Sequence, residues 1–394
     1  MKILFIGARL FDDVDFYLKE NNIESVLTES NPNSPNLDCA DFKFIVPRGM
    51  DAPLKIAKEK SVKGIIPLIG IDDPLMDVAI AKQKVEKDLN IPFIASNTFS
   101  ISITSDKIKT KEFFNEFCID TAKFQVISSE PDKLINIDNS NISNISSFDN
   151  IDFEYPVVLK QRSGQGGRDI FIAENSSEAN DYMNYHDEVL CEEFIEGSEI
   201  SIEVLGFKGE YLPLVPVYKG ETTFEGIHPL NKVRSAPAEI EGLNNEMVRN
   251  IAYNIAKSLK SEGTIDIDFI FSKKDKKLYA LEVNSRPSGT RYLTAAASGI
   301  HPLTKLIDMV QGNFDIKTVE NEIKDYFALE IPIMNYSGPK KEDPQKKFTK
   351  NSWVVHGPKN YERITISGES KEKTLELARY LLGNKLDDFN LDKS

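Results

Sequence analysis

Two neighbouring segments of the chain carry carboxylate and amide side chains at a spacing that could hold a divalent metal ion. Residues 263–271 and 278–284 alternate apolar and polar side chains, and a short lysine-rich loop joins them. Successive side chains of a β-strand point to opposite faces, so this pattern predicts an antiparallel hairpin with one apolar face. The residues predicted for that face are Ile265, Ile267, Phe269, Phe271, Tyr279, Leu281 and Val283.

The polar face of the same hairpin carries Asp266, Asp268, Glu282 and Asn284, and the predicted register places Asp268 directly opposite Glu282. Two opposed carboxylates, about 5 Å apart at Cβ, repel each other. Mg²⁺, which prefers carboxylate and amide oxygens, would remove that repulsion. Asp266 replaces Asp268 as a ligand if the strand is shifted by two residues, and an exposed acidic face without metal is the other interpretation. Arg286 follows closely enough to reach a phosphate oxygen.

A glycine-rich segment further upstream could bind phosphate. Residues 155–160 form an apolar strand that ends at Lys160. Glycines allow several backbone N–H groups to approach one anion, and a lysine at a strand end can place its charge on a phosphate. The loop matches neither the Walker A nor the dinucleotide pattern, so a plain glycine turn beside a solvated lysine is the alternative. The loop residues are Ser163, Gly164, Gly166 and Gly167.

Residues 189–199 form a strand that breaks at Gly197 and then restarts. Such a break exposes backbone N–H and C=O groups that can pair with the edge of an adenine base. Glu199, just beyond the break, could hold ribose hydroxyls. An ordinary hairpin with acidic ends is the alternative interpretation of the same residues.

The elements around these segments change character along the chain. Residues 1–98 alternate strand and helix signals, which predicts a parallel α/β sheet. The strands predicted there are 2–6, 25–28, 42–46, 64–68 and 91–94, and the helices are 14–21 and 74–88. An Asn/Ser/Asp-rich stretch, 131–152, is predicted to be a surface loop. The later predicted elements are strands 169–173, 188–195 and 199–205, helix 241–261, strand 363–367 and helix 371–382.

The composition narrows the classes of partner and location. The chain has 394 residues, and 48 Lys+Arg against 62 Asp+Glu give a formal charge of −14. An acidic surface repels phosphate backbones and anionic lipid, so we expect neither a nucleic acid nor a membrane as partner. The first residues suggest a buried strand, not a secretory signal. Cys39, Cys118 and Cys191 are widely spaced, so we expect reduced thiols and a cytoplasmic location.

Taken in order, these segments resemble a known superfamily. Ser105-Asp106-Lys107 opens a helix, and the glycine loop, the strand break and the acidic hairpin follow. This order is similar to that of the ATP-grasp carboxylate–amine ligases, which include carbamoyl-phosphate synthase large chains, biotin carboxylase and D-alanine–D-alanine ligase. The resemblance covers roughly residues 1–310. It implies an α/β and α+β fold, with a parallel α/β domain at 1–98 before the two lobes of an ATP-grasp fold at 99–197 and 198–394.

The resemblance also implies roles for individual residues. Lys107 and Lys160 would contact the ATP phosphates, beneath the loop of Ser163, Gly164, Gly166 and Gly167. The adenine and ribose would lie against Glu192, Glu193, Phe194, Ile195 and Glu199. Mg²⁺, or Mn²⁺ in its place, would be held by Asp268, Glu282 and Asn284.

Two basic positions are implied for the transferred phosphate and one for the substrate. Arg286 would steady the phosphate, and Lys232 is favoured over Arg234 as a second contact. Arg291, at the start of a predicted helix, could hold a substrate carboxylate, or could instead form a structural salt bridge.

The activity implied is an ATP-dependent ligase that activates a small carboxylate as an acyl phosphate for attack by an amine. The stretch around Arg286 is loosely similar to the amino-acid ligase of pyrrolysine synthesis, which favours an amino acid or small carboxylic acid as substrate. One alternative is a carbamoyl-phosphate-synthase-like or carboxylase-like enzyme that phosphorylates bicarbonate or a carboxylate. A non-catalytic ATP-binding module is another. A homodimer is the expected assembly for this class.

Overall fold

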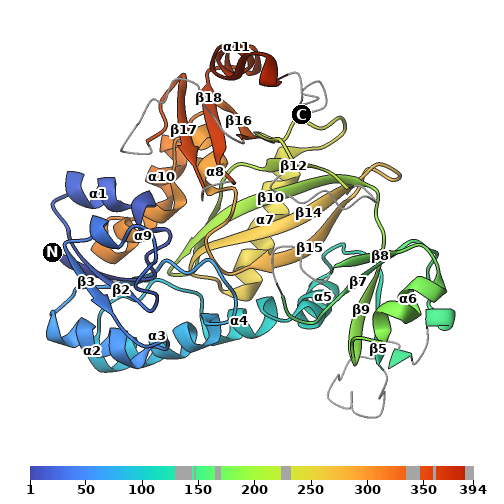
Figure 1. Ribbon diagram of the computed structural model, residues 1–394, viewed down its shortest axis with the longest axis horizontal. Coiled ribbons are helices and arrows are strands. Elements are labelled where there is room, and N and C mark those ends of the chain that lie inside the picture. The colour runs from blue at the N-terminus through green and yellow to red at the C-terminus, as the bar shows by residue number, and fades with distance from the viewer. Residues whose placement is uncertain are drawn as a thin grey trace.

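The computed structural model describes residues 1–128, 144–145, 148–164, 170–222, 232–333, 347–357 and 361–386. These residues form a mixed α/β fold with three β-sheets (Figure 1). The first sheet lies at one end of the molecule, a small second sheet lies at the other, and the large third sheet lies between them and extends to the C-terminal strands. Gly166 and Gly167 fall outside the described residues. Within the described part of the chain, no helix has the length and apolar character needed to span a bilayer.

The first sheet is parallel and has the order β3-β2-β1-β4, as the alternating pattern predicts. Its strands are β1 Lys2–Ile6, β2 Glu24–Glu29, β3 Phe42–Ile45 and β4 Ile65–Pro67. The helices around it are α1 Asp15–Glu20, α2 Asp51–Glu59 and α3 Leu75–Leu89. The first of these agrees with the predicted helix 14–21 to within one residue at each end, and the 3-10 helix η1 Phe11–Asp13 comes before it.

The prediction of a fifth strand at 91–94 is wrong. Only one parallel bridge forms there, between Phe93 and Ile65. The Pro92 carbonyl accepts from the Ile65 N–H at 3.0 Å, and Ile94 N–H donates back to the Ile65 carbonyl at 3.0 Å. Since proline has no N–H, the segment cannot extend this pairing into a regular ladder.

The small sheet has the order β6-β5-β9-β7-β8 and carries the predicted phosphate strand. The helices α4 Thr98–Thr104 and α5 Lys107–Glu116 connect it to the first sheet (Figure 1). Asp106 caps α5, because its side chain accepts from the N–H groups of Ile108 and Lys109. The strands are β5 Phe124–Ser128, β6 Asn144–Ile145, β7 Val157–Lys160, β8 Phe171–Ala173 and β9 Glu188–Glu193, and the helix packed on them is α6 Ser176–Met183.

The described part of the Asn/Ser/Asp-rich stretch is not the surface loop that its composition predicts. β6 pairs in parallel with β5, and a 3-10 helix, η4 Phe148–Asn150, follows. Phe148 is only 1% exposed and packs in the core of the small sheet with Val157 and Leu159. One aromatic side chain in a polar stretch is enough to anchor it, because burial of a phenyl ring is strongly favourable.

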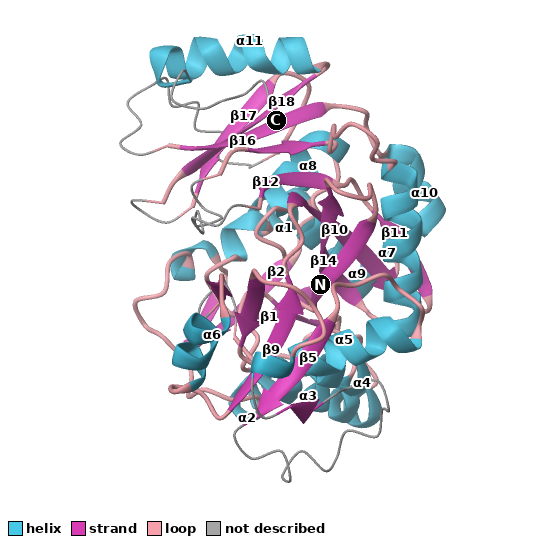
Figure 2. Cartoon of the chain, turned by 90° about the vertical axis from the view of Figure 1, so that its right-hand side faces the viewer, coloured by secondary structure: helices cyan, strands magenta, loops and turns pink. Residues whose placement is uncertain are grey.

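The large sheet has nine strands in the order β15-β14-β10-β12-β13-β16-β18-β17, with β11 paired to β10. The helix α7 Asn245–Leu259 packs its apolar side on β10, β14 and β15, and α11 Lys371–Leu382 covers the C-terminal strands (Figure 2). The strands are β10 Gly197–Phe207, β11 Glu210–Pro213, β12 Val217–Glu221, β13 Arg234–Ala236, β14 Gly263–Ser272, β15 Leu278–Asn284, β16 Phe327–Pro332, β17 Ser352–His356 and β18 Arg363–Gly368. The remaining helices are α8 Arg291–Ser298, α9 Pro302–Gln311 and α10 Ile316–Glu322.

The acidic hairpin forms as predicted at its polar end, but its apolar face differs. Asp268 pairs with Glu282, whereas the next residue, Phe269, pairs with Ala280. Leu281 is therefore the extra residue of a β-bulge, which shifts the alternation of side chains by one position. As a result Leu278 and Ala280 join the core, in place of the predicted Tyr279 and Leu281.

We predict that Phe148→Ala lowers the free energy of unfolding by about 3–5 kcal/mol, because it opens a cavity in the small sheet. Urea denaturation followed by circular dichroism would measure the change. Phe99→Ala is a suitable control, because Phe99 is 49% exposed and its replacement should cost far less. Equal effects of the two substitutions would show that Phe148 does not anchor its segment.

Candidate active site

The polar face of the large sheet gathers side chains from two neighbouring strands, β14 and β15. Asp268 lies opposite Glu282, and Asp266 lies opposite Asn284, as the hairpin register predicts. The Asn284 amide nitrogen lies 3.3 Å from Glu282 Oε1 and 3.5 Å from Asp268 Oδ2. The amide nitrogen thus donates toward the two carboxylates, whereas Asn284 Oδ1 accepts from Arg286 at 3.0 Å, so an ion bound by all three side chains would require the amide to turn over.

These side chains fit the predicted ion in the chemistry of their donor atoms. Carboxylate and amide oxygens are hard ligands, and Mg²⁺ is usually held by one or two protein carboxylates. Among the described residues, no group of three or more His, Cys, Asp or Glu side chains is arranged to hold a metal. The predicted set consists of two carboxylates and an amide. Asp266 Oδ1 is buried without a hydrogen-bond partner among those residues, which leaves Asp266 close by as an additional oxygen donor.

A cation that the sequence analysis missed already contacts this face. Lys219, on β12, donates from Nζ to Asp268 Oδ1 at 2.6 Å. Burial disfavours the charged lysine, but Asp268 and Asp266 outweigh burial and raise the pKa of Lys219. Lys219 therefore stays protonated and offsets the repulsion between the opposed carboxylates.

The local backbone explains why the strand alternation does not predict Lys219. On β10, Glu199 pairs with Gly220 and Ile200 pairs with Tyr218, so Lys219 has no partner in the β10–β12 ladder. It is the extra residue of a second β-bulge, and a bulge redirects the side chain it carries. A lone lysine in the segment 217–221 was the only available signal.

The charged groups of the small sheet and α5 act on the same site. Burial raises the pKa of Glu282, but the charges of Lys107, Lys160 and Lys219 outweigh it and hold that pKa below its ordinary value. These three lysines come from α5, β7 and β12 respectively. The fold thus directs cations from three elements toward one carboxylate of the hairpin.

Glu192, which is predicted to contact the adenine, has ion pairs that the sequence analysis did not predict. Its carboxylate is buried between two lysines, with Lys160 Nζ at 2.9 Å from Oε1 and Lys111 Nζ at 2.9 Å from Oε2. Burial raises its pKa, but Lys111 and Lys160 outweigh burial and lower it. Lys111 was missed, although it lies one helical turn beyond Lys107 on the same face of α5. Glu192 therefore holds Lys160 in place at the end of β7.

The glycine loop begins against the N-terminus of α5. Lys107 Nζ donates to the Gly164 carbonyl at 2.6 Å, and the Lys107 N–H donates to the Arg162 carbonyl at 2.9 Å. Arg162 bridges Asp106 at 2.9 Å and Glu188 at 2.6 Å. These contacts hold the first loop residues, Ser163 and Gly164, beside Lys107, which is one of the predicted phosphate contacts.

The strand break lies where the small and large sheets meet. β9 ends at Glu193 and β10 begins at Gly197, and the intervening Phe194 and Ile195 are partly exposed. Glycine is required at 197, because a Cβ there would come within 2.2 Å of the Phe271 carbonyl oxygen. The segment from Glu193 to Ile195 therefore has the position expected of a hinge between the lobes.

Lys232 and Arg234 point to different surroundings. Lys232 Nζ donates to Glu199 Oε1 at 3.0 Å and to the Glu221 carbonyl at 2.8 Å. Arg234 is buried instead against Glu330 at 3.1 Å. The structure therefore brings Lys232, and not Arg234, to the Glu199 side of the sheet.

The two arginines after the hairpin contact the first part of the chain. Arg286 donates from Nη2 to Asn284 Oδ1 at 3.0 Å and from Nε to Asp72 at 2.5 Å. Arg291 donates from Nε to Asp13 at 2.5 Å, and Asp13 is fully buried. Arg286 thus lies beside the predicted metal ligands, whereas the contact of Arg291 agrees with the structural salt bridge.

Comparison with known proteins identifies the family of the chain. The sequence profile of the ATP-grasp domain matches residues 104–290. A protein named carbamoyl-phosphate synthase, from Methanobrevibacter smithii, is 51% identical over 97% of this chain and 99% of its own length. The chain belongs to the ATP-grasp superfamily of carboxylate–amine ligases.

More distant relatives of this ATP-grasp protein are longer. The carbamoyl phosphate synthase large chain of Thermoanaerobacter pseudethanolicus is 24% identical over 80% of this chain, which spans only 30% of that protein. Two solved structures share the fold. They are N5-carboxyaminoimidazole ribonucleotide synthetase from Thermotoga maritima (TM-score 0.67, 18% identity, 96% of both chains) and the biotin carboxylase domain of Hydrogenobacter thermophilus 2-oxoglutarate carboxylase (TM-score 0.68, 18% identity, 97% of this chain and 89% of that one).

We predict that Lys219→Met destabilises this ATP-grasp protein in the absence of metal by about 3 kcal/mol, because the buried carboxylates lose their counter-charge. Mg²⁺ should then raise the melting temperature of the variant more than that of the wild type. Urea denaturation in EDTA and melting curves with added Mg²⁺ would measure both effects.

Lys273→Met provides the control, because Lys273 forms exposed ion pairs with Glu196 and Glu221 and should contribute less than about 1 kcal/mol. A Lys219→Met protein as stable as the wild type, with an unchanged response to Mg²⁺, would contradict the proposed neutralisation.

Proposed function

We propose that this protein uses ATP to phosphorylate a small carboxylate and transfers the resulting acyl group to an amine. One observation carries the proposal: Asp268 lies directly opposite Glu282, and Lys219 donates to Asp268 from β12. The charges of Lys107 and Lys160 also lower the pKa of Glu282. A triphosphate needs such a combination of cations and metal-binding oxygens, and phosphoryl transfer depends mainly on positioning and charge neutralisation.

Each group has a part in this proposal. Asp268, Glu282 and Asn284 would hold Mg²⁺, which neutralises charge on the transferring phosphoryl group when it is bound. Lys107 and Lys160 would contact the ATP phosphates, and Glu192 keeps Lys160 oriented. The strand break from Glu193 to Ile195 would receive the adenine, with Glu199 at the ribose.

The chemistry requires little proton transfer in its first step. An oxygen of the substrate carboxylate attacks the γ-phosphorus, a new O–P bond forms, and the bond to the β-phosphate oxygen breaks to release ADP. The amine nitrogen then attacks the acyl carbon, the C–O bond to phosphate breaks, and phosphate leaves. The proton lost by the amine passes to phosphate or solvent. Arg286, held by Asp72 and Asn284, lies where it could offset the charge on the transferred phosphate.

A second candidate is phosphorylation of bicarbonate, with carbamate chemistry to follow. The relative from Methanobrevibacter smithii favours it, because that protein is named carbamoyl-phosphate synthase and matches over nearly the whole of both chains. The biotin carboxylase domain from Hydrogenobacter thermophilus was solved with MgADP and bicarbonate and is described as a dimer. A homodimer is therefore also part of our proposal, and the mass of the protein in solution tests it.

Release of ADP identifies the carboxylate. We predict that ADP is released only when a small carboxylic acid or amino acid is supplied together with an amine. Release with bicarbonate alone, or with bicarbonate and ammonia, would establish the second candidate. A rise in melting temperature with Mg-ATP, but no turnover under any of these conditions, would indicate a binding module and contradict both.

We predict that Glu282→Gln reduces turnover at least about 100-fold, because it removes one metal-binding charge from the reaction centre. The fold should persist, since the amide has the same shape, and circular dichroism and melting curves would verify this. Glu376→Gln is the matched control, because Glu376 is an exposed residue of α11 that pairs with Lys373 and should keep full activity. Normal turnover of Glu282→Gln would refute the metal assignment.

A further inference from the structure

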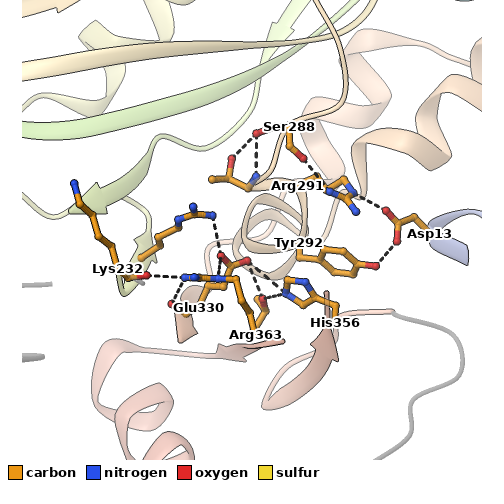
Figure 3. Close-up of polar contacts among 11 residues, drawn as sticks. Asp13, Lys232, Ser288, Arg291, Tyr292, Glu330, His356 and Arg363 are labelled. Atoms are coloured by element: carbon orange, nitrogen blue, oxygen red, sulfur yellow. Dashed lines mark hydrogen bonds and ion pairs between the residues drawn. The ribbon is translucent and has the colours of Figure 1, made fainter. Parts of the chain in front are cut away.

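The C-terminal strands contain a buried charged cluster centred on Glu330 of β16, which is fully buried (Figure 3). Arg363 Nε lies 2.6 Å from Glu330 Oε1, and Arg234 Nη1 lies 3.1 Å from the same oxygen. On the other oxygen, His356 Nε2 lies at 3.4 Å and the Thr365 hydroxyl donates at 3.3 Å. Burial raises the pKa of Glu330, but Arg363, His356 and Arg234 outweigh burial and hold it well below its ordinary range.

Arg363 also contacts the segment that carries the predicted phosphate contact. Its Nη2 donates to the backbone carbonyl of Lys232 at 2.7 Å, while its Nε remains on Glu330. Arg363 is only 4% exposed. The planar guanidinium thus joins the buried carboxylate on one side to the Lys232 backbone on the other.

The side chain of Lys232 extends away from this anchor. Figure 3 shows its carbonyl directed at Arg363 and its ammonium at the opposite end of the residue. The ammonium donates to Glu199 and to the Glu221 carbonyl. The side-chain carbons of Lys232 pack directly against Gly220, because a Cβ added to Gly220 would come within 2.8 Å of Lys232 Cδ. The backbone anchor and this packing together fix the direction of the ammonium.

We propose that Arg363 is a positioning residue for Lys232, which it holds through the carbonyl so that the ammonium points to the phosphate side of the large sheet. A contact between Lys232 and a phosphate rests on the proposed function. The position of Arg363 is informative, because it lies outside residues 104–290, where the ATP-grasp profile matches. The C-terminal strands therefore contribute to the geometry of the active site and not only to the stability of the fold.

The energetics favour a geometric role for this cluster. Buried ion pairs gain little stability over apolar residues of similar volume, because desolvation offsets their attraction. A guanidinium, however, fixes two acceptors at defined angles, and a lysine ammonium at the same place cannot do so. Replacement of Arg363 by lysine therefore keeps the charge beside Glu330 and removes the bond to the Lys232 carbonyl.

The test combines turnover with the chemical reactivity of Lys232. Arg363→Lys should lower kcat roughly tenfold, as expected for a small misplacement of a catalytic group. It should also increase several-fold the rate at which trace acetic anhydride acetylates Lys232, measured by peptide mass spectrometry with Lys55, whose side chain is 79% exposed, as the reference within the same protein. Arg363→Gln, which keeps the Glu330–Arg234 pair, should give the same two changes if the lysine variant does not fold.

Thr365→Val is the matched control, because it removes a hydrogen bond to the same Glu330 and does not touch Lys232. It should leave both kcat and the acetylation of Lys232 unchanged. In a double-mutant cycle, Arg363→Lys should lower kcat no further once Lys232→Met is present, since the two act as one unit. Fully multiplicative effects, or equal changes in the control, would overturn the inference.

The acetylation measurement also separates this inference from the proposed function. If no substrate supports ADP release, the proposed function fails, yet a faster acetylation of Lys232 in the Arg363 variants still supports the positioning role. An unchanged rate of acetylation in a folded Arg363 variant overturns the positioning role, whatever the enzyme turns over.

Discussion

The opposition of Asp268 and Glu282 across one hairpin is the constraint on which the rest of the site depends. Two carboxylates that face each other in a sheet repel, and a buried setting strengthens that repulsion. The pair persists only where positive charge compensates it. Lys219 provides part of that charge through its ion pair with Asp268, and the carboxylate oxygens are of the kind that a divalent ion binds.

Several distant elements are arranged to meet this demand for positive charge. α5 contributes Lys107, and β7 contributes Lys160. Glu192 binds both Lys160 and Lys111, and its negative charge offsets the repulsion between their two ammonium groups. The same buried carboxylate thus organises one edge of the site, as Glu330 organises another through Arg363. In both places an anion without direct contact to the acidic hairpin determines where a cation can lie.

The sequence predicts the parts of this site that depend on local alternation. The pairing of Asp268 with Glu282 and the strand that ends at Lys160 follow from the period of two. The strand break is predicted at Gly197, between strands 188–195 and 199–205, but β9 already ends at Glu193 and Gly197 is the first residue of β10. What it does not predict arises where that period fails. The bulges at Leu281 and Lys219 each shift a strand by one residue, and the ion pairs of Glu192 depend on a helix that packs from elsewhere in the chain. Phe148 escapes prediction because its neighbours are polar.

The contacts of Arg286 with Asp72 and of Arg291 with Asp13 have a consequence for where this protein can be divided. Both acidic partners belong to the first part of the chain, and Asp13 and Arg291 share a buried setting. α9 seals the same junction, since Leu303 and Ile307 pack with Phe5 of the first sheet. A fragment that began at the boundary of the matched ATP-grasp domain would expose the apolar side chains of α9 to solvent. It would also leave the guanidinium of Arg291 without Asp13, its anionic partner. The smallest autonomous catalyst therefore includes the first sheet.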